Sequence, residues 1–144
     1  MIRIGRSLRL QLFCFLFLLP GCRKDDQPVR DCVCSEQFAT YTAFVKDRSG
    51  NLLDSLQATS TNLRTGKQYS FRQPWQGEPF LGHAGRYIVL TDEATKDLGI
   101  VPDTIVFKAT RGGTIVAEGR YLFNTDECRC HINKVAGADT LTTL

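Results

Sequence analysis

Two Cys-x-Cys pairs set the strongest constraint on how this chain can fold. Cys32 and Cys34 form one pair, and Cys128 and Cys130 form the other. Residues two apart on a strand point to the same face, so two such strands side by side would bring the four sulfurs into two facing couples. Antiparallel neighbours would join Cys32 to Cys130 and Cys34 to Cys128, whereas parallel neighbours would join Cys32 to Cys128 and Cys34 to Cys130. A bond within either pair is disfavoured because the intervening extended residue separates the sulfurs.

The same four cysteines could instead bind a metal ion. Four thiolates, with His131 nearby, could bind zinc in place of forming disulfides. Cysteines in zinc sites are usually spaced more widely than Cys-x-Cys, and an oxidising compartment favours disulfides. We therefore predict two disulfides between the pairs and no cofactor, with Cys32, Cys34, Cys128 and Cys130 as metal ligands in the alternative.

The amino-terminal segment predicts export. Arg3, Arg6 and Arg9 precede an apolar run over residues 10–19. A run of about ten residues is too short for a helix that spans a bilayer, which needs about twenty, but it suits the core of a signal peptide. Removing these three arginines from the 18 Lys and Arg leaves 15, which equals the 15 Asp and Glu. A nearly neutral mature chain gives no electrostatic reason to expect nucleic acid as a partner.

The end of the apolar run, Leu19-Pro20-Gly21-Cys22, resembles the lipobox of bacterial lipoproteins. In that family the cysteine thiol receives a diacylglycerol and the segment before it is cleaved off. The resemblance implies a signal peptide over residues 1–21 and a lipid on Cys22. We expect residues 22–31 to form a flexible lipidated tether and residues 32–144 to form the folded domain.

The tether carries a short charged motif, Lys24-Asp25-Asp26. It resembles an export tag that directs some lipoproteins to the outer face of the outer membrane. The resemblance implies a protein anchored in the outer membrane and displayed at the cell surface. The alternative is an ordinary solvated tether on the periplasmic face.

Short β-type runs separated by turn residues fill the rest of the chain. Residues 92–98 could form one helical turn, but no stretch keeps a helical period. Ile105, Phe107 and Ala109 share one strand face, and Gly112-Gly113 is a hairpin signal. The pattern predicts an all-β protein, a single antiparallel β-sandwich of about seven or eight short strands, transthyretin-like or immunoglobulin-like. The expected strands are residues 38–45, 52–61, 68–72, 86–91, 104–110, 114–124, 128–135 and 140–144.

Three segments resemble the carboxypeptidase regulatory-like domain, a transthyretin-like sandwich. They are Val-Lys-Asp-Arg-Ser-Gly-Asn-Leu-Leu at residues 45–53, Thr65-Gly66, and Gly-Arg-Tyr-Ile-Val at residues 85–89. The resemblance implies a non-catalytic accessory module.

No familiar catalytic motif is present, so we expect a binding or structural role and no enzymatic activity. An enzyme with an unrecognised site is the least favoured reading. The adjacent acids Asp92/Glu93 and Asp126/Glu127 are expected to be solvated charges in turns. His131 is expected on a strand, facing outward.

The loop over residues 73–84 is the one candidate binding surface in the sequence. It holds Trp75, Phe80 and His83. Exposed aromatics on a sandwich loop would suit a protein or glycan partner, whereas buried ones would cap the core.

Overall fold

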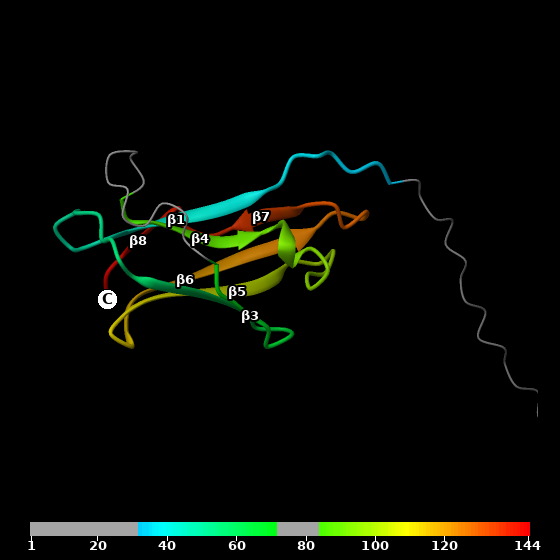
Figure 1. Cartoon of the computed structure of the whole chain (residues 1–144). Helices are drawn as coiled ribbons and strands as arrows, with labels where there is room; N and C mark the ends of the chain where they lie inside the picture. Colours follow the sequence, from blue (N-terminus) through cyan, green and yellow to red (C-terminus); the bar gives the residue numbers. More distant parts are fainter. Residues whose placement is uncertain (1–31, 72–83) are drawn as a thin grey trace, which may run out of the picture. The chain divides into compact units, whose positions relative to one another are not determined.

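The computed structural model describes residues 32–71 and 84–144 and confirms an all-β sandwich (Figure 1). The segment before residue 32, which includes Cys22, lies outside the described residues, as do Trp75, Phe80 and His83. The described elements are β1 (Thr40–Lys46), β2 (Gln57–Asn62), β3 (Gln68–Tyr69), β4 (Arg86–Thr91), the 3₁₀ helix η2 (Asp92–Ala94), β5 (Asp103–Arg111), β6 (Thr114–Thr125), β7 (Ile132–Ala136) and β8 (Thr140–Thr142).

Two sheets make up the sandwich. One has the strand order β4-β1-β8 and the other the order β3-β2-β5-β6-β7. All neighbours are antiparallel except β1 and β8, which run parallel from Phe44↔Thr140 to Lys46↔Thr142. The sequence predicts antiparallel pairing throughout, but these two strands are not joined by a hairpin, so no short turn forces them to run in opposite directions.

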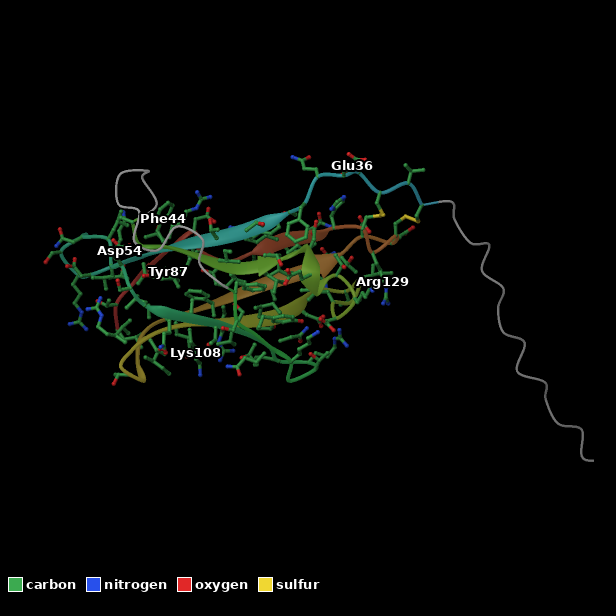
Figure 2. The ribbon with its side chains drawn as sticks, viewed as in Figure 1. Glu36, Phe44, Asp54, Tyr87, Lys108 and Arg129 are labelled. Carbon is green, nitrogen blue, oxygen red and sulfur yellow. A yellow bond between two sulfur atoms is a disulfide. The ribbon has the colours of Figure 1, made fainter. Side chains whose placement is uncertain are left out.

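The core lies between the sheets and follows the alternation of strand residues. In β6, Ala117, Tyr121 and Phe123 are buried while their neighbours in the strand are more exposed. In β5, Ile105, Phe107 and Ala109 are fully buried, which confirms the predicted apolar face. Figure 2 shows Tyr87 of β4 and Lys108 of β5 on different sides of the five-stranded sheet.

Two turns match their sequence signals. Gly112 and Gly113 have φ values of 56° and 83°, the left-handed conformation that a tight hairpin between β5 and β6 requires. In the turn after β1, a carboxylate oxygen of Asp47 accepts hydrogen bonds from the backbone N–H groups of Ser49 and Asn51, both at 2.8 Å.

Several predicted strands are longer than the observed ones. The strand expected at residues 68–72 covers only Gln68–Tyr69. The strand expected at residues 52–61 begins only at Gln57, because the preceding residues form a bend in which Ser55 has φ 60°. The strand expected at residues 128–135 begins only at Ile132, because residues 126–131 form a turn. Within residues 32–71 and 84–144, no helix is long and apolar enough to cross a membrane.

Candidate functional site

Two disulfides join the segment before β1 to the turn before β7. Cys32 bonds to Cys128 and Cys34 bonds to Cys130, with Cα–Cα distances of 5.6 Å and 5.4 Å. Of the two connectivities left open by the sequence, this is the one for segments that run in the same direction. The expected strand context is wrong, because none of these cysteines lies in a strand. We call this pair of disulfides the staple.

The staple bears directly on the metal alternative. A sulfur in a disulfide offers no thiolate, so the four cysteines are not available as zinc ligands while they are paired. In the part of the chain that the structure describes, no group of three or more His, Cys, Asp and Glu side chains is placed to hold a metal ion. The arrangement therefore favours disulfides over the zinc site.

The turn that carries Cys128 and Cys130 is held by Asp126. Its Oδ1 accepts the backbone N–H of Cys130 at 2.9 Å, and its carbonyl accepts the N–H of Arg129 at 3.0 Å. Arg129 has φ 54°, so the chain reverses sharply at this point. Thr125 Oγ1 also donates to the carbonyl of His131 at 3.1 Å. Asp126 lies in a turn, as the sequence predicts, and one of its carboxylate oxygens holds that turn together.

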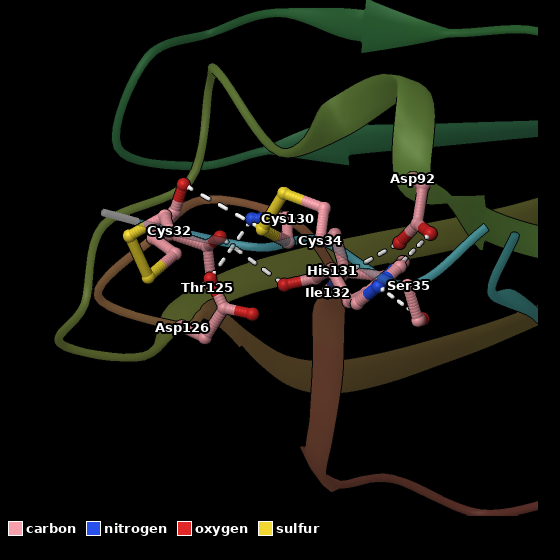
Figure 3. The surroundings of a disulfide bond; sticks show 10 residues. Cys32, Cys34, Ser35, Asp92, Thr125, Asp126, Cys130, His131 and Ile132 are labelled. Atoms are coloured by element: carbon pink, nitrogen blue, oxygen red, sulfur yellow. Dashed lines mark hydrogen bonds and ion pairs between the residues drawn. A yellow bond between two sulfur atoms is a disulfide. The ribbon is translucent and has the colours of Figure 1, made fainter. Parts of the chain in front are cut away.

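Next to the staple, three side chains form a hydrogen-bonded row. Ser35 Oγ lies 2.9 Å from Nε2 of His131, and Nδ1 of His131 lies 2.8 Å from Oδ2 of Asp92 (Figure 3). The His131 side chain is 26% exposed and the Asp92 side chain 7%. The expectations of an outward-facing His131 and a solvated Asp92 are both wrong, because the turn directs the imidazole at a carboxylate that the sandwich has largely buried.

Asp92 is held in place from several sides. It is the first residue of η2, and Thr91 is the N-cap of that helix. Its Oδ2 accepts the backbone N–H of Ala39 at 2.7 Å, and its Oδ1 accepts the N–H of Ile132 at 2.9 Å. These two bonds tie η2 to the chain before β1 and to the first residue of β7.

The same contacts keep Asp92 ionised. Burial is the largest single influence on the pKa of Asp92 and acts to raise it, but the hydrogen bonds from Ala39, His131 and Ile132 together outweigh burial and lower this pKa. An ionised carboxylate can only accept, so Nδ1 of a neutral His131 carries the proton. Nε2 is then left as an acceptor for the hydroxyl of Ser35.

A surface groove of about 460 Å³ runs beside this row. Ser35 and His131 line it together with Phe38 and Tyr41. Phe38 is 59% exposed, whereas the Tyr41 ring packs edge-on against buried Phe123 with 5.3 Å between ring centroids. The groove therefore combines a hydroxyl, an imidazole and an accessible aromatic surface.

A second polar cluster lies around Asp103, whose side chain is 4% exposed. Arg64 donates to it from Nε at 2.5 Å and from Nη2 at 2.8 Å, and Gly99 N–H donates at 3.0 Å. The hydrogen bond from Arg64 is the main cause of the lowered pKa of Asp103. The partners of Asp103 come from neighbouring loops and strands, so this cluster fixes the fold.

Sequence reasoning missed Ser35 and Asp92 as members of a site. One signal could have found Ser35. It follows Cys34 as His131 follows Cys130, so the parallel connectivity alone would place Ser35 opposite His131. Asp92 had no comparable signal, because its approach to His131 depends on how the two sheets pack.

Comparisons with protein-family models, with curated proteins and with solved structures found no match to this chain. The fold and the staple define its class, which is a β-sandwich fastened by two disulfides. The resemblances to lipoproteins and to the carboxypeptidase regulatory-like domain stay predictions.

Proposed function

We propose that this chain is a lipid-anchored cell-envelope protein whose β-sandwich is a binding module presented by the tether at residues 22–31. The observation that carries the proposal is the position of the staple. Cys32 and Cys34 directly follow the expected tether and are both bonded to the turn before β7. The disulfides therefore link the start of the domain, where the expected tether joins it, to the rest of the sandwich.

The surroundings of the staple explain why such fastening is useful. Residues 32–38 are exposed and precede the first strand of the sandwich. Without the disulfides, this segment would separate readily from the sandwich, because local opening of exposed chain ends costs little free energy. The two covalent links pass any load from the anchor to the turn between β6 and β7, and so to the five-stranded sheet.

The redox chemistry of the staple agrees with an envelope location. Cys32, Cys34 and Cys128 are exposed, so reduced glutathione or thioredoxin would have access to the bonds in the cytoplasm. Two exposed structural disulfides are typical of proteins beyond the inner membrane. We propose a protein or glycan as the partner of the module and no nucleic acid, because the chain without its first segment is close to neutral.

The test of the anchor is Cys22→Ala, with Cys14→Ala as the matched control within the apolar run. We expect the wild-type protein and Cys14→Ala to enter the detergent phase in phase partitioning, and Cys22→Ala to be unprocessed or to stay in the aqueous phase. If Cys22→Ala is processed and partitions as the wild type does, the lipid anchor is refuted.

The leaflet is tested separately with protease added to intact cells. Display at the surface, as Lys24-Asp25-Asp26 implies, requires that the protein is degraded while a periplasmic control survives. Survival of the full-length protein beside a degraded surface control would place it on the periplasmic face.

A further inference from the structure

Ser35, His131 and Asp92 form the arrangement that activates a serine hydroxyl, and we propose that Ser35 is a nucleophile that cleaves small carboxylic esters in the adjoining groove. This inference goes beyond the binding role proposed above and departs from the sequence expectation of a non-catalytic module. It rests on geometry that was not visible in the sequence.

The distances fit the roles. A general base must lie within about 2.6–3.2 Å of the group it deprotonates, and Nε2 of His131 is 2.9 Å from Ser35 Oγ. A nucleophile and base of this kind require a third group that orients the base. Asp92 does so from the other side of the ring, at 2.8 Å.

Asp92 is a positioning residue, and hydrogen bonds to the backbone hold its carboxylate in place. Its two oxygens accept backbone N–H groups from Ala39, in the segment before β1, and from Ile132, in β7. The carboxylate therefore keeps its place and its charge when the imidazole becomes protonated. A buried carboxylate in this position stabilises an imidazolium and fixes the tautomer that accepts the serine proton.

The reaction balances without any group beyond water. Ser35 Oγ attacks the carbonyl carbon of the ester and forms a new C–O bond, while its proton moves to Nε2 of His131. The bond to the leaving alcohol breaks and that alcohol takes the proton from Nε2. Water then attacks the acyl-serine in the same way, which releases a carboxylic acid and restores Ser35.

The groove sets the class of substrate. Its volume of about 460 Å³ is in the range of small-molecule sites, which is about 300–1,000 Å³. Phe38 offers an exposed apolar surface and Tyr41 forms part of the wall. A short aliphatic or aryl ester fits this combination, because Phe38 and Tyr41 lie in the same groove as Ser35 and can contact the alkyl or aryl part of the ester.

The experiment uses the processed lipoprotein, oxidised and purified in a detergent without ester groups. A fluorophosphonate probe reports on the nucleophile, and p-nitrophenyl butyrate reports on turnover. Peptide mass spectrometry should find the phosphonate on Ser35. Ser35→Ala should remove both labelling and turnover, whereas Ser49→Ala, at an exposed serine in the turn after β1, should leave them unchanged.

Variants of the base and its orienting group separate catalysis from a merely structural contact. His131→Gln and Asp92→Asn should each lower the rate about 100-fold or more while thermal melting shows that the protein is folded. The wild-type rate should rise with pH, since only the unprotonated imidazole can accept the serine proton, and His131→Gln should lack this rise.

A structural contact predicts the opposite result. The proposal is overturned if the folded wild-type protein is labelled no faster than Ser35→Ala, or if the label is found on other serines. It is also overturned if Asp92→Asn changes stability but leaves the rate and its pH dependence unchanged.

Discussion

Ser35 and His131 are separated by 96 residues, the same separation as in Cys32–Cys128 and in Cys34–Cys130, and the two side chains meet at 2.9 Å. The Ser35–His131 contact therefore follows from the alignment of the two segments that the disulfides set. The staple has two consequences, because it closes the domain and also sets a hydroxyl against an imidazole.

The two disulfides should contribute redundantly to global stability but unequally to the serine–histidine contact. Each closes a loop of the same length, so replacing either pair with serine should cost little while the other bond remains. Replacing both pairs should cost about 4–5 kcal/mol in the chain-entropy model. Denaturant unfolding of the two double variants and of the quadruple variant measures this.

The two disulfides should differ in how strongly they support the Ser35–His131 hydrogen bond. Cys34→Ser with Cys130→Ser should weaken the Ser35–His131 hydrogen bond, since both residues directly follow the lost bond. Cys32→Ser with Cys128→Ser should weaken it less. The imidazole nitrogen signals of His131 in NMR spectra report on this contact, and equal changes in the two double variants would contradict the argument.

Asp92 should matter for folding as well as for the site. Asp92→Ala removes the acceptor for the N–H groups of Ala39 and Ile132, and a buried donor without a partner costs about 1–3 kcal/mol. Glu93→Ala, at the exposed neighbour, is the control and should change the free energy of unfolding by less than about 0.5 kcal/mol. Similar losses for the two variants in urea would show that the Asp92 contacts contribute little.

The fold could be predicted from sequence because its signals are local. Ile105, Phe107 and Ala109 occupy every second position of one strand, Gly112-Gly113 supplies the left-handed turn, and these patterns depend only on neighbouring residues. The direction of β8 beside β1 could not be predicted, because nothing in either strand records which way a distant segment will run.

The site could be predicted only in part. The cysteine pairs indicated two disulfides but not their connectivity, since both connectivities satisfy the same spacing. His131 was placed wrongly because a strand was expected to begin at residue 128, whereas the chain reverses at Arg129 and the strand begins only at Ile132. Asp92 looked like a solvated acid, and its burial depends on contacts with Ala39 and Ile132, which lie far from it in the sequence.

The stability of the domain should fall in acid because of two carboxylates. The pKa values of Asp92 and Asp103 are both lowered in the folded protein. As the pH falls below about 4, the unfolded chain takes up protons before these groups do in the folded chain, so protonation favours unfolding. Their contribution is complete above the unfolded pKa and is lost as the pH falls through the folded pKa.

The Arg64–Asp103 pair offers a direct check of this acid sensitivity. Arg64→Gln removes the hydrogen bond that is the largest cause of the lowered Asp103 pKa. The slope of unfolding free energy against pH below about 4 should therefore become shallower than in the wild type. Lys108→Gln, which removes a 3.8 Å ion pair with Glu118 on the sheet surface, should keep the wild-type slope. An unchanged slope in Arg64→Gln would contradict the assignment.

Gly137 should be far less tolerant of a side chain than Gly50, although both have a positive φ, of 128° and 87°. Alanine at Gly50 meets no atom within 4 Å, so its cost is limited to backbone strain of about 1–2 kcal/mol. Alanine at Gly137 adds a collision, because its Cβ would lie under 3 Å from three ring atoms of buried Tyr121, whose hydroxyl is fixed by a 2.9 Å bond to the carbonyl of Ala138. The ring cannot retreat without disturbing Phe107, whose ring centroid is 6.4 Å away. Gly137→Ala should therefore lose about 1–3 kcal/mol more than Gly50→Ala in urea unfolding, and equal losses would mean that the turn after β7 can move away from the ring.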